Sequence, residues 1–308
     1  NDRGAGDAAT GAHDMKPMAW ITGAGGLVGS YLVHSAPRWA PQWRVRGLTR
    51  ADLDLTDHAA VASRFANEKP ALILHCAAIS KTNECDANPA LARRVNVDAT
   101  TQLADLAAAI PFLFLSSDQV FDGRQGWYVE TDRINPINRY GETKAAAERL
   151  VLQNPRHTVV RLALTAGASP TGDRSFVEDM RRAVARGQRL TLFTDEFRTP
   201  IAAGTVARTV WELAIRAQAG LFHLGGADRL SRMEIGAELG RWYPDLAAAI
   251  QPGSVASYQG PARPPDLSMR CDKLQRLLSF PLSGLRDWMA LRPAAQPDPW
   301  DYPPDSTR

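Results

Sequence analysis

Cysteine is scarce in this sequence, with three residues among 308. Cys76, Cys85 and Cys271 show no Cys-x-x-Cys spacing. An odd number of cysteines without that spacing cannot form a complete disulfide framework, so the sequence favours a reducing compartment. Histidines are few as well, and the six that occur are scattered without His-Glu-x-x-His spacing, so we expect no metal site.

Long apolar runs and charge of one sign are also missing. No apolar run approaches the roughly 20 residues that a helix needs to span a bilayer. Lys and Arg number 36 against 33 Asp and Glu, and the net charge of +3 is too small to indicate a nucleic-acid partner. We therefore expect a cytoplasmic protein with neither a membrane nor a nucleic acid as its partner. Apolar residues, at 44%, are frequent enough for a substantial core.

Short apolar runs alternate with longer helical patterns in the first half of the chain. Strands are predicted at Met18–Thr22, Trp43–Leu48, Ala71–Cys76, Phe112–Ser116 and Thr158–Leu162. Helices are predicted at Leu27–Ser35, Ala59–Ala66, Pro89–Ala109 and Asn138–Gln153. This alternation is typical of βαβ units, and it predicts an α/β fold with a doubly wound, Rossmann-like parallel sheet.

The pattern changes after residue 163. Helices are predicted at Ser175–Arg186, Ala203–Gln218 and Ser231–Leu239, with short strands at Leu190–Phe193 and Gly220–Leu224. We therefore predict a flexible arm at 1–16, a nucleotide-binding domain at 17–163, a smaller α+β substrate lobe at 164–292 and a Pro-rich, irregular tail at 293–308. The two lobes are expected to share one body.

A glycine loop follows the first predicted strand. Gly23, Gly26 and Gly29 recur every third residue in TGAGGLVGSYLV. Between a strand and a helix, such glycines allow a tight turn, let the backbone approach a pyrophosphate and let the helix lie close to the strand. The spacing is not the GxGxxG of the usual dehydrogenase fingerprint, and a glycine-rich turn without a ligand is the alternative.

The end of the second predicted strand bears on the choice of cofactor. Arg50 stands at this point, in GLTR, with acidic residues slightly later in DLDLTD. An arginine here suits the 2′-phosphate of NADP(H), whereas an acid suits the ribose hydroxyl of NAD(H). The sequence thus favours NADPH, with NADH possible, and an ordinary surface role for Arg50 is the alternative.

Three residues form a candidate catalytic set. Tyr140 and Lys144 are four residues apart in a predicted helix and so share one face. An ammonium beside a phenol favours the phenolate, so that Tyr140 can exchange a proton with a carbonyl or alcohol oxygen while hydride moves at carbon. Ser117 follows the buried run PFLFL, at a strand end where open α/β sheets bind ligands. It can hold the substrate oxygen beside Tyr140.

With these residues in view, the chain resembles the extended short-chain dehydrogenases/reductases, and within them the dTDP-4-dehydrorhamnose reductase family. The resemblance spans about residues 17 to 292 and is carried by DLDLTD, SSDQVFDG, ETDRINPINRYGETKAAAE and RPPDLSM. It implies an NADPH-dependent reductase of a nucleotide-linked 4-keto-6-deoxysugar, with Ser117, Tyr140 and Lys144 catalytic. The cofactor contacts that it implies are Gly23, Gly26, Leu27, Val28, Gly29, Arg50, Asp54, Leu55, Ala77, Ala78, Tyr140 and Lys144.

The implied sugar pocket departs from the family pattern. Gln119 stands where a tyrosine is usual, and Leu164 stands where a tryptophan is usual. Substrate contacts are expected from these two residues together with Ser117 and Asp118. Arg198, Arg263 and Arg270 are candidates for the substrate phosphates, because planar guanidinium groups suit that role, and solvated surface arginines are the alternative.

Other functions remain open at this point. An epimerase of the same superfamily would also fit the cofactor and catalytic residues, whereas a dehydratase usually has an Asp-Glu pair where this chain has Asp118-Gln119. A non-catalytic NADP-binding regulatory subunit, like the partner of methionine adenosyltransferase, is a candidate from another class. A homodimer is possible.

Overall fold

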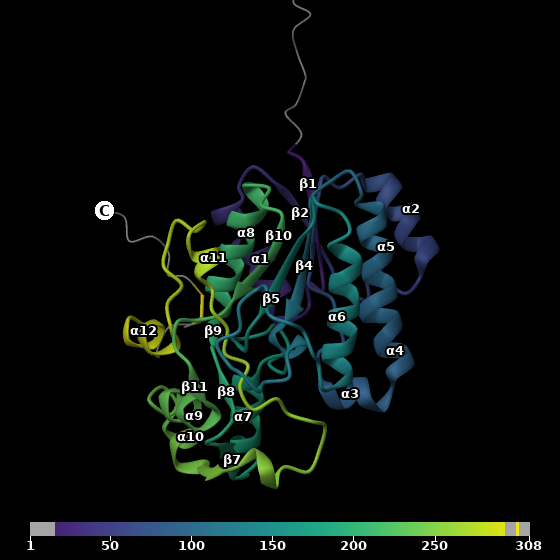
Figure 1. Ribbon diagram of the computed structural model, residues 1–308. Helices are drawn as coiled ribbons and strands as arrows, with labels where there is room; N and C mark the ends of the chain where they lie inside the picture. The colour runs from purple at the N-terminus through teal and green to yellow at the C-terminus, as the bar shows by residue number, and fades with distance from the viewer. Residues whose placement is uncertain (1–15, 293–299, 302–308) are drawn as a thin grey trace, which may run out of the picture.

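The computed structural model describes residues 16–292, 300 and 301, and its centre is a six-stranded sheet between two layers of helices (Figure 1). The strands of this sheet are β1 (Met18–Thr22), β2 (Arg44–Leu48), β3 (Leu72–His75), β4 (Phe112–Ser117), β5 (Thr158–Leu162) and β10 (Gly220–Leu224). They pair in parallel in the order β10-β5-β4-β3-β1-β2. The predicted doubly wound α/β sheet is confirmed, with strand ends within one residue of those predicted.

Both faces of the sheet are buried, which explains the continuous apolar runs in the sequence. In β1, Trp20 and Ile21 are fully buried but belong to two different core clusters, because successive side chains point to opposite faces. All six residues of β4 are buried as well. Strands of this kind leave only their ends available for binding.

Two helices cover one face of the sheet, and another set covers the other. The first layer contains α1 (Leu27–Trp39) and α8 (Ala203–Ile215), which pack against each other. The Trp211 indole of α8 donates a hydrogen bond to the carbonyl oxygen of Leu32 in α1, at 3.0 Å. The second layer contains α2 (His58–Glu68), α3 (Thr82–Ala87), α4 (Pro89–Arg93), α5 (Ala99–Leu106) and α6 (Arg139–Val151).

The long helix predicted at Pro89–Ala109 is divided. One turn of π-helix at Arg94–Asp98 separates α4 from α5, and α5 ends at Leu106. Such turns often mark functional positions in helices. The buried Asn96 side chain leaves this turn toward Ile79, whose backbone N–H and C=O it binds at 2.8 and 3.0 Å.

A smaller lobe lies below the large sheet in Figure 1. It contains α7 (Phe176–Ala185), α9 (Arg232–Gly240), α10 (Pro244–Ala249) and three strand pairs: β6 (Thr165–Ala166) with β9 (Ile201–Ala202), β7 (Leu190–Phe193) with β12 (Ile250–Gly253), and β8 (Phe197–Arg198) with β11 (Leu230–Ser231). Two short helices, α11 (Asp272–Gln275) and α12 (Leu285–Ala290), follow. The helices predicted in this half are confirmed, and each begins or ends within three residues of its predicted bounds.

One strand was expected in the smaller lobe and lies elsewhere. Gly220–Leu224 is β10, the edge strand of the large sheet, where it pairs with β5. The preceding helix, α8, packs on α1 in the same layer. The backbone groups of β10 form hydrogen bonds with β5. The local sequence pattern around residue 220 does not show this pairing, because β5 is distant in the sequence. The division of the chain at residue 163 remains a prediction about domains.

The predicted arm at 1–16 and tail at 293–308 lie outside the described residues, except for Lys16, Trp300 and Asp301. Trp300 is buried, and its ring centroid lies 5.0 Å from that of Trp242. Its carbonyl oxygen accepts a hydrogen bond from Gly204 N, at the start of α8. Among the described helices, none has the length and apolar character of a membrane span.

Candidate active site

The glycine loop lies where the strand order reverses. After β1 the chain first builds β2 on one side, and then β3 on the other, so the loops after β1 and β3 diverge around a crevice. Gly23 has a left-handed backbone, with φ of +70°, and a Cβ atom there would lie 2.7 Å from Ala77 N. The two loops therefore touch at the position where folds of this kind bind ligands.

The loop leads directly into α1. Gly26 is the N-cap residue, and Leu27 and Val28 are the first helical residues, both partly buried against the core. The first turn of a helix has backbone N–H groups without partners inside the helix, and these attract phosphate. Ala77 and Ala78 follow β3 on the other side of the crevice. The structure thus brings the predicted phosphate loop and the two predicted alanines together.

The residues after β2 form a turn of their own. Arg50 is exposed, and its Nε lies 3.6 Å from a carboxylate oxygen of Asp54. The other oxygen of Asp54 accepts hydrogen bonds from the backbone N–H and the hydroxyl of Thr56, which lower the pKa of Asp54 below its usual value. Leu55 packs partly buried against the core on the α2 side. Arginine and carboxylate lie side by side, so the position alone does not separate the two cofactors.

A buried histidine joins the ends of β1 and β3. Thr22 Oγ1 lies 2.6 Å from His75 Nδ1, and Thr100 Oγ1 lies 2.9 Å from His75 Nε2. Because the Thr100 hydroxyl donates to the carbonyl oxygen of Asn96, Nε2 must be the protonated nitrogen. Burial lowers the pKa of His75 to about 3, so the ring stays neutral. His75 is a buried core residue that links Thr22 to Thr100.

The three candidate catalytic residues converge at the end of β4. Ser117 is its last residue, and Tyr140 and Lys144 come from the first two turns of α6; all three are buried. Asn138 caps α6 by accepting a hydrogen bond from Gly141 N at 2.9 Å. A Cβ atom on Gly141 would lie 2.1 Å from the carbonyl oxygen of Gln119, so α6 begins in close contact with the loop after β4.

Burial controls the charge of this set. It raises the pKa of Tyr140 above its usual value, and a hydrogen bond with Ser117 opposes the rise only in part. Burial also lowers the pKa of Lys144 to about 7, and the ammonium nitrogen lies 4.1 Å from the ring centroid of Phe114. The sequence led us to expect a phenolate favoured by the lysine, but in the protein alone Tyr140 is a protonated phenol. That is the form which a general acid needs.

Asp118 and Gln119 adjoin this set. The Ser117 hydroxyl donates to Asp118 Oδ1 at 3.0 Å, and the Gln119 side chain accepts from Asn138 at 2.9 Å. Burial raises the pKa of Asp118 to about 6, while Arg198 opposes the rise. Leu164, after β5, packs partly buried against the large core. Polar side chains of the β4 loop are therefore linked to both Ser117 and the start of α6.

The two predicted phosphate-binding arginines share one carboxylate. Arg198 lies 2.9 Å from a Glu196 oxygen, and Arg263 binds both Glu196 oxygens at 2.7 and 3.0 Å. Arg232 is a third cation in this group, since it interacts with Glu196, Arg198 and Arg263. The interaction of Arg198 with Asp118 connects the cluster to Ser117. Three cations facing two acidic groups leave an excess of positive charge for an anionic ligand.

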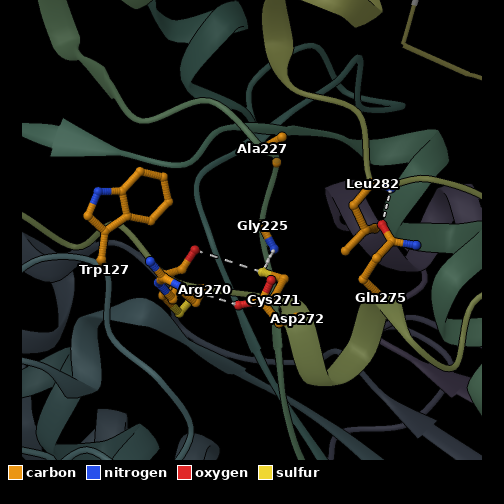
Figure 2. A pocket seen from close by; sticks show the side chains of 10 residues that line it. Trp127, Gly225, Ala227, Arg270, Cys271, Asp272, Gln275 and Leu282 are labelled. Carbon is orange, nitrogen blue, oxygen red and sulfur yellow. Dashed lines mark hydrogen bonds and ion pairs between the residues drawn. The ribbon is translucent and has the colours of Figure 1, made fainter.

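Arg270 lies apart from that cluster. It lines a hollow of about 260 Å³ at the carboxyl end of β10, with Trp127, Cys271 and the backbone of Gly225 (Figure 2). The Gly225 N–H donates to the Cys271 sulfur at 3.1 Å. Within the described ranges, no three His, Cys, Asp or Glu side chains are grouped so as to hold a metal ion. Because this hollow is not lined by Arg198 or Arg263, Arg270 is not part of the group that contains those two arginines.

Sequence reasoning missed several buried polar residues around the site. Asn96 also donates to the Thr143 hydroxyl of α6 at 3.0 Å, and so links the loop after β3 to the helix that carries Tyr140 and Lys144. Glu148 lies on α6 and binds Arg161 of β5. Its spacing, eight residues after Tyr140, was a usable signal, because positions i, i+4 and i+8 share one helix face. Glu196 gave no such signal, since its partners are distant in the sequence.

A known family accounts for nearly the whole described chain. The profile described as the RmlD substrate binding domain matches residues 18–291. The chain belongs to this family. Three relatives illustrate its range. A dTDP-4-dehydrorhamnose reductase of Streptomyces griseus is 32% identical over 285 residues, which are 89% of this chain and 91% of the relative. A probable low-salt glycan biosynthesis reductase of Haloferax volcanii is 31% identical over 265 residues, 80% and 87% of the two chains.

The third relative of this RmlD-family chain is not named as a reductase. The beta subunit of methionine adenosyltransferase 2 from Xenopus laevis is 30% identical over 275 residues, 84% of this chain and 82% of the relative. Among solved structures, a dTDP-4-dehydrorhamnose reductase of Clostridium acetobutylicum superposes with a TM-score of 0.80 at 25% identity, over 89% of this chain and 99% of that one. The Bacillus anthracis enzyme in complex with NADP has the same fold, with a TM-score of 0.81 at 22% identity, over 90% and 98%.

Proposed function

We propose that this RmlD-family protein is an NADPH-dependent reductase of a nucleotide-linked 4-keto-6-deoxysugar. The observation that carries the proposal is the convergence of Ser117, Tyr140 and Lys144 at the end of β4, beside the glycine crevice. A buried phenol, a hydroxyl and an ammonium in one place are the groups that carbonyl reduction requires. The reductases among the relatives support the same activity.

The crevice fits a dinucleotide. Side chains are excluded at Gly23 and Gly29, where a Cβ atom would lie 2.7 and 2.2 Å from backbone atoms. The backbone can therefore approach a pyrophosphate closely, at the N-terminus of α1. Arg50 is exposed at the end of β2 and would bind a 2′-phosphate. Together with the NADP complex of the Bacillus anthracis enzyme, this favours NADPH, with NADH possible.

The chemistry assigned to the chain is proton transfer. The bound cofactor supplies a hydride to the carbonyl carbon. Ser117 would hold the carbonyl oxygen, and the Tyr140 hydroxyl would donate its proton to that oxygen, which completes the alcohol and leaves a phenolate. The Lys144 ammonium would stabilise the phenolate and bind the nicotinamide ribose. The raised pKa of Tyr140 suits this direction, because the proton is present before the hydride arrives.

The substrate is inferred from charge. Nucleotide sugars carry two phosphates, and the Arg198, Arg232 and Arg263 cluster has cations in excess of Glu196. Arg263 is more accessible than Arg198, since 31% of its side chain is exposed against 8% for Arg198. Gln119 and Leu164 would determine which sugar fits, because they occupy positions that resemble the sugar pocket of the family.

A second candidate is a non-catalytic, NADP-binding regulatory subunit. The Xenopus laevis subunit is almost as similar to this chain as the reductases are, so identity does not separate the two functions. An epimerase would use the same residues but would regenerate its cofactor in every cycle. A dehydratase is disfavoured, because glutamine follows Asp118 in place of the usual glutamate.

The three functions predict different results when purified protein is mixed with NADPH and a panel of nucleotide-linked sugars. A reductase consumes NADPH with a 4-keto sugar and stops when either reactant is exhausted. An epimerase, given the oxidised cofactor in place of NADPH, changes the sugar with no net change in the cofactor, because the hydride that it removes is returned. A regulatory subunit binds NADPH but changes neither. Failure of every sugar in the panel, with cofactor binding intact, would contradict the reductase proposal and favour the regulatory one.

A further inference from the structure

The catalytic face of α6 continues one turn beyond Lys144. Tyr140, Lys144 and Glu148 are spaced by four residues, lie in one row on the helix and are all buried. Only 2% of the Glu148 side chain is exposed. The row therefore places a carboxylate directly after the lysine, inside the protein. A buried carboxylate is costly unless it is paired, so its partner determines what it can do.

That partner is Arg161 of β5. Its Nη2 lies 2.9 Å from Glu148 Oε2, and its Nε lies 3.1 and 3.2 Å from the two carboxylate oxygens. The guanidinium also lies over the ring of Phe121, with 5.0 Å between its central carbon and the ring centroid. This fork holds the carboxylate at a fixed position, one helix turn after the lysine. Lys144 itself lies over the Phe114 ring, an apolar neighbour that solvates its charge only weakly.

We propose that Glu148, one helix turn after Lys144, is a positioning residue that keeps the Lys144 ammonium charged within an apolar interior, and that Arg161 limits how much of this carboxylate charge reaches the lysine. The inference rests on the proposed role of Lys144, but it concerns a charge in the protein alone. Burial lowers the pKa of Lys144, and among the groups that oppose this effect Glu148 is the strongest. Geometry and electrostatics thus agree on the same pair.

The other titratable groups facing Lys144 are neutral, and they include Tyr140, whose pKa burial raises above its usual value. Cys76, after β3, and Cys85, of α3, have thiol pKa values raised by burial to about 12 and about 11. His75 of β3 has a pKa of about 3 and carries no charge at neutral pH. Glu148 is consequently the charged neighbour that favours the protonated form of Lys144 over the neutral form.

Arg161 also contacts two groups besides Glu148. His223 of β10 lies with its Nε2 3.3 Å from Arg161 Nη1, and burial lowers the pKa of His223 to about 3. The backbone oxygen of Glu130 accepts from the same Nη1 at 3.4 Å, and its carboxylate accepts from His223 N at 3.0 Å. Arg161 is thus held by three groups, of which Glu148 is the one bound through three contacts.

The direct test is an NMR titration of lysine Cε resonances in protein labelled only on lysine. The chain contains five lysines, so five resonances are expected, and Lys144→Met identifies the one of interest. Replacing Glu148 with glutamine should lower the pKa of Lys144 by at least about one unit, the effect of removing one nearby buried charge. Arg161→Gln should raise it, because the carboxylate then acts on the lysine alone. Opposite signs from two neighbouring substitutions are not expected from a general loosening of the structure.

Two further variants keep the outcome decisive. Glu142→Gln is the matched control, since Glu142 lies on the same helix and pairs with Arg139, but 49% of its side chain is exposed. It should leave the pKa of Lys144 within about 0.3 units of the wild type. If a single charge-removing variant fails to fold, the double variant Glu148→Gln with Arg161→Gln leaves no unpaired charge and should place the pKa of Lys144 below that of the wild type.

Equal shifts in both single variants, or no shift in the double variant, would overturn the proposal. The titration needs neither cofactor nor substrate. The titration can therefore contradict this proposal while the reductase assay succeeds, and it can support this proposal while the reductase assay fails. If the protein is a reductase, the pH dependence of its kcat in Glu148→Gln should move in the same direction as the Lys144 resonance. A structural role alone would lower kcat without moving that profile.

Discussion

A Cβ atom on Gly29 would lie 2.2 Å from the carbonyl oxygen of Gly23. The contact joins the first full turn of α1 to the turn that follows β1, and it fixes how closely the helix approaches the strand. Gly23 is itself wedged against Ala77 of the neighbouring loop. The crevice between β1 and β3 is therefore lined by backbone atoms at these two positions, and a residue larger than glycine does not fit at either of them.

This contact predicts a large difference between two neighbouring glycine substitutions. Gly29→Ala should lower the free energy of unfolding by about 1–3 kcal/mol, because the helix must move away from the strand. It should also weaken the binding of NADPH. Gly25→Ala is the control, since its Cβ atom would meet only the Thr49 side chain at 3.6 Å, an ordinary contact. Denaturant unfolding measures both variants, and equal losses would show that the close approach has no special role.

Cofactor choice is predicted to depend on Arg50. Arg50→Ala should weaken the binding of NADPH by about 1.5–3 kcal/mol, the contribution of a charged hydrogen bond, and leave the binding of NADH nearly unchanged. Arg93→Ala is matched to it, because Arg93 is also exposed and lies at the same 3.6 Å from an aspartate. Fluorescence titration with both cofactors measures the difference. Equal weakening of NADPH and NADH would exclude a 2′-phosphate contact.

The arginine cluster is predicted to bind the diphosphate of the substrate. Arg263→Ala should weaken the binding of a nucleoside diphosphate by about 2–5 kcal/mol, as expected when one partner of a desolvated charge pair is removed. Arg198→Ala should also reduce stability, because Arg198 donates a hydrogen bond to the carbonyl oxygen of Pro264 at 3.2 Å. Calorimetry compares these variants with Arg241→Ala, an exposed arginine paired to Glu238. If no nucleoside diphosphate binds even with NADPH present, the substrate class is wrong.

Asp118 predicts a pH-dependent stability. Its folded-state pKa of about 6 lies above the ordinary 3.8, so the folded state binds this proton more tightly. The resulting stabilisation is complete below pH 3.8 and is lost as the pH rises through about 6. Asp118→Asn should therefore gain about 1–3 kcal/mol relative to the wild type between about pH 5 and about pH 8.

The control for this effect is Asp52→Asn. Hydrogen bonds from Thr49 lower the pKa of the exposed Asp52, so it is ionised in both states throughout that range. Its difference from the wild type should stay constant with pH. Parallel curves for the two variants would mean that Asp118 is not held in an environment that opposes its charge.

Sequence reasoning was most successful where the signal is local. The strands β1, β3, β4 and β5 are buried on both faces and read as apolar runs, whereas the edge strand β2 contains two exposed arginines. Tyr140 and Lys144 are one turn apart on a helix. The glycine loop is equally local. These features predicted the fold and the place of the site. The roles of the individual site residues remain predictions.

Features that depend on distant partners were not predictable. The pairing of β10 with β5 joins residues about 60 positions apart, and Glu196 meets Arg263 over 67 positions. The protonated state of Tyr140 follows from how deeply it is buried, which the spacing to Lys144 does not reveal. Tertiary packing, rather than residue type, sets these properties.

The most direct test of the central claim follows one deuterium atom. The protein is mixed with NADPH deuterated at the transferred position of the nicotinamide and with a nucleotide-linked 4-keto-6-deoxysugar, and the product is analysed by mass spectrometry. A reductase places one deuterium on the sugar for each NADPH consumed, and Tyr140→Phe should slow this transfer by about 100-fold or more while still binding NADPH. Folded protein that binds NADPH but yields no deuterated sugar, or transfer that is equally fast in Tyr140→Phe, would contradict the account.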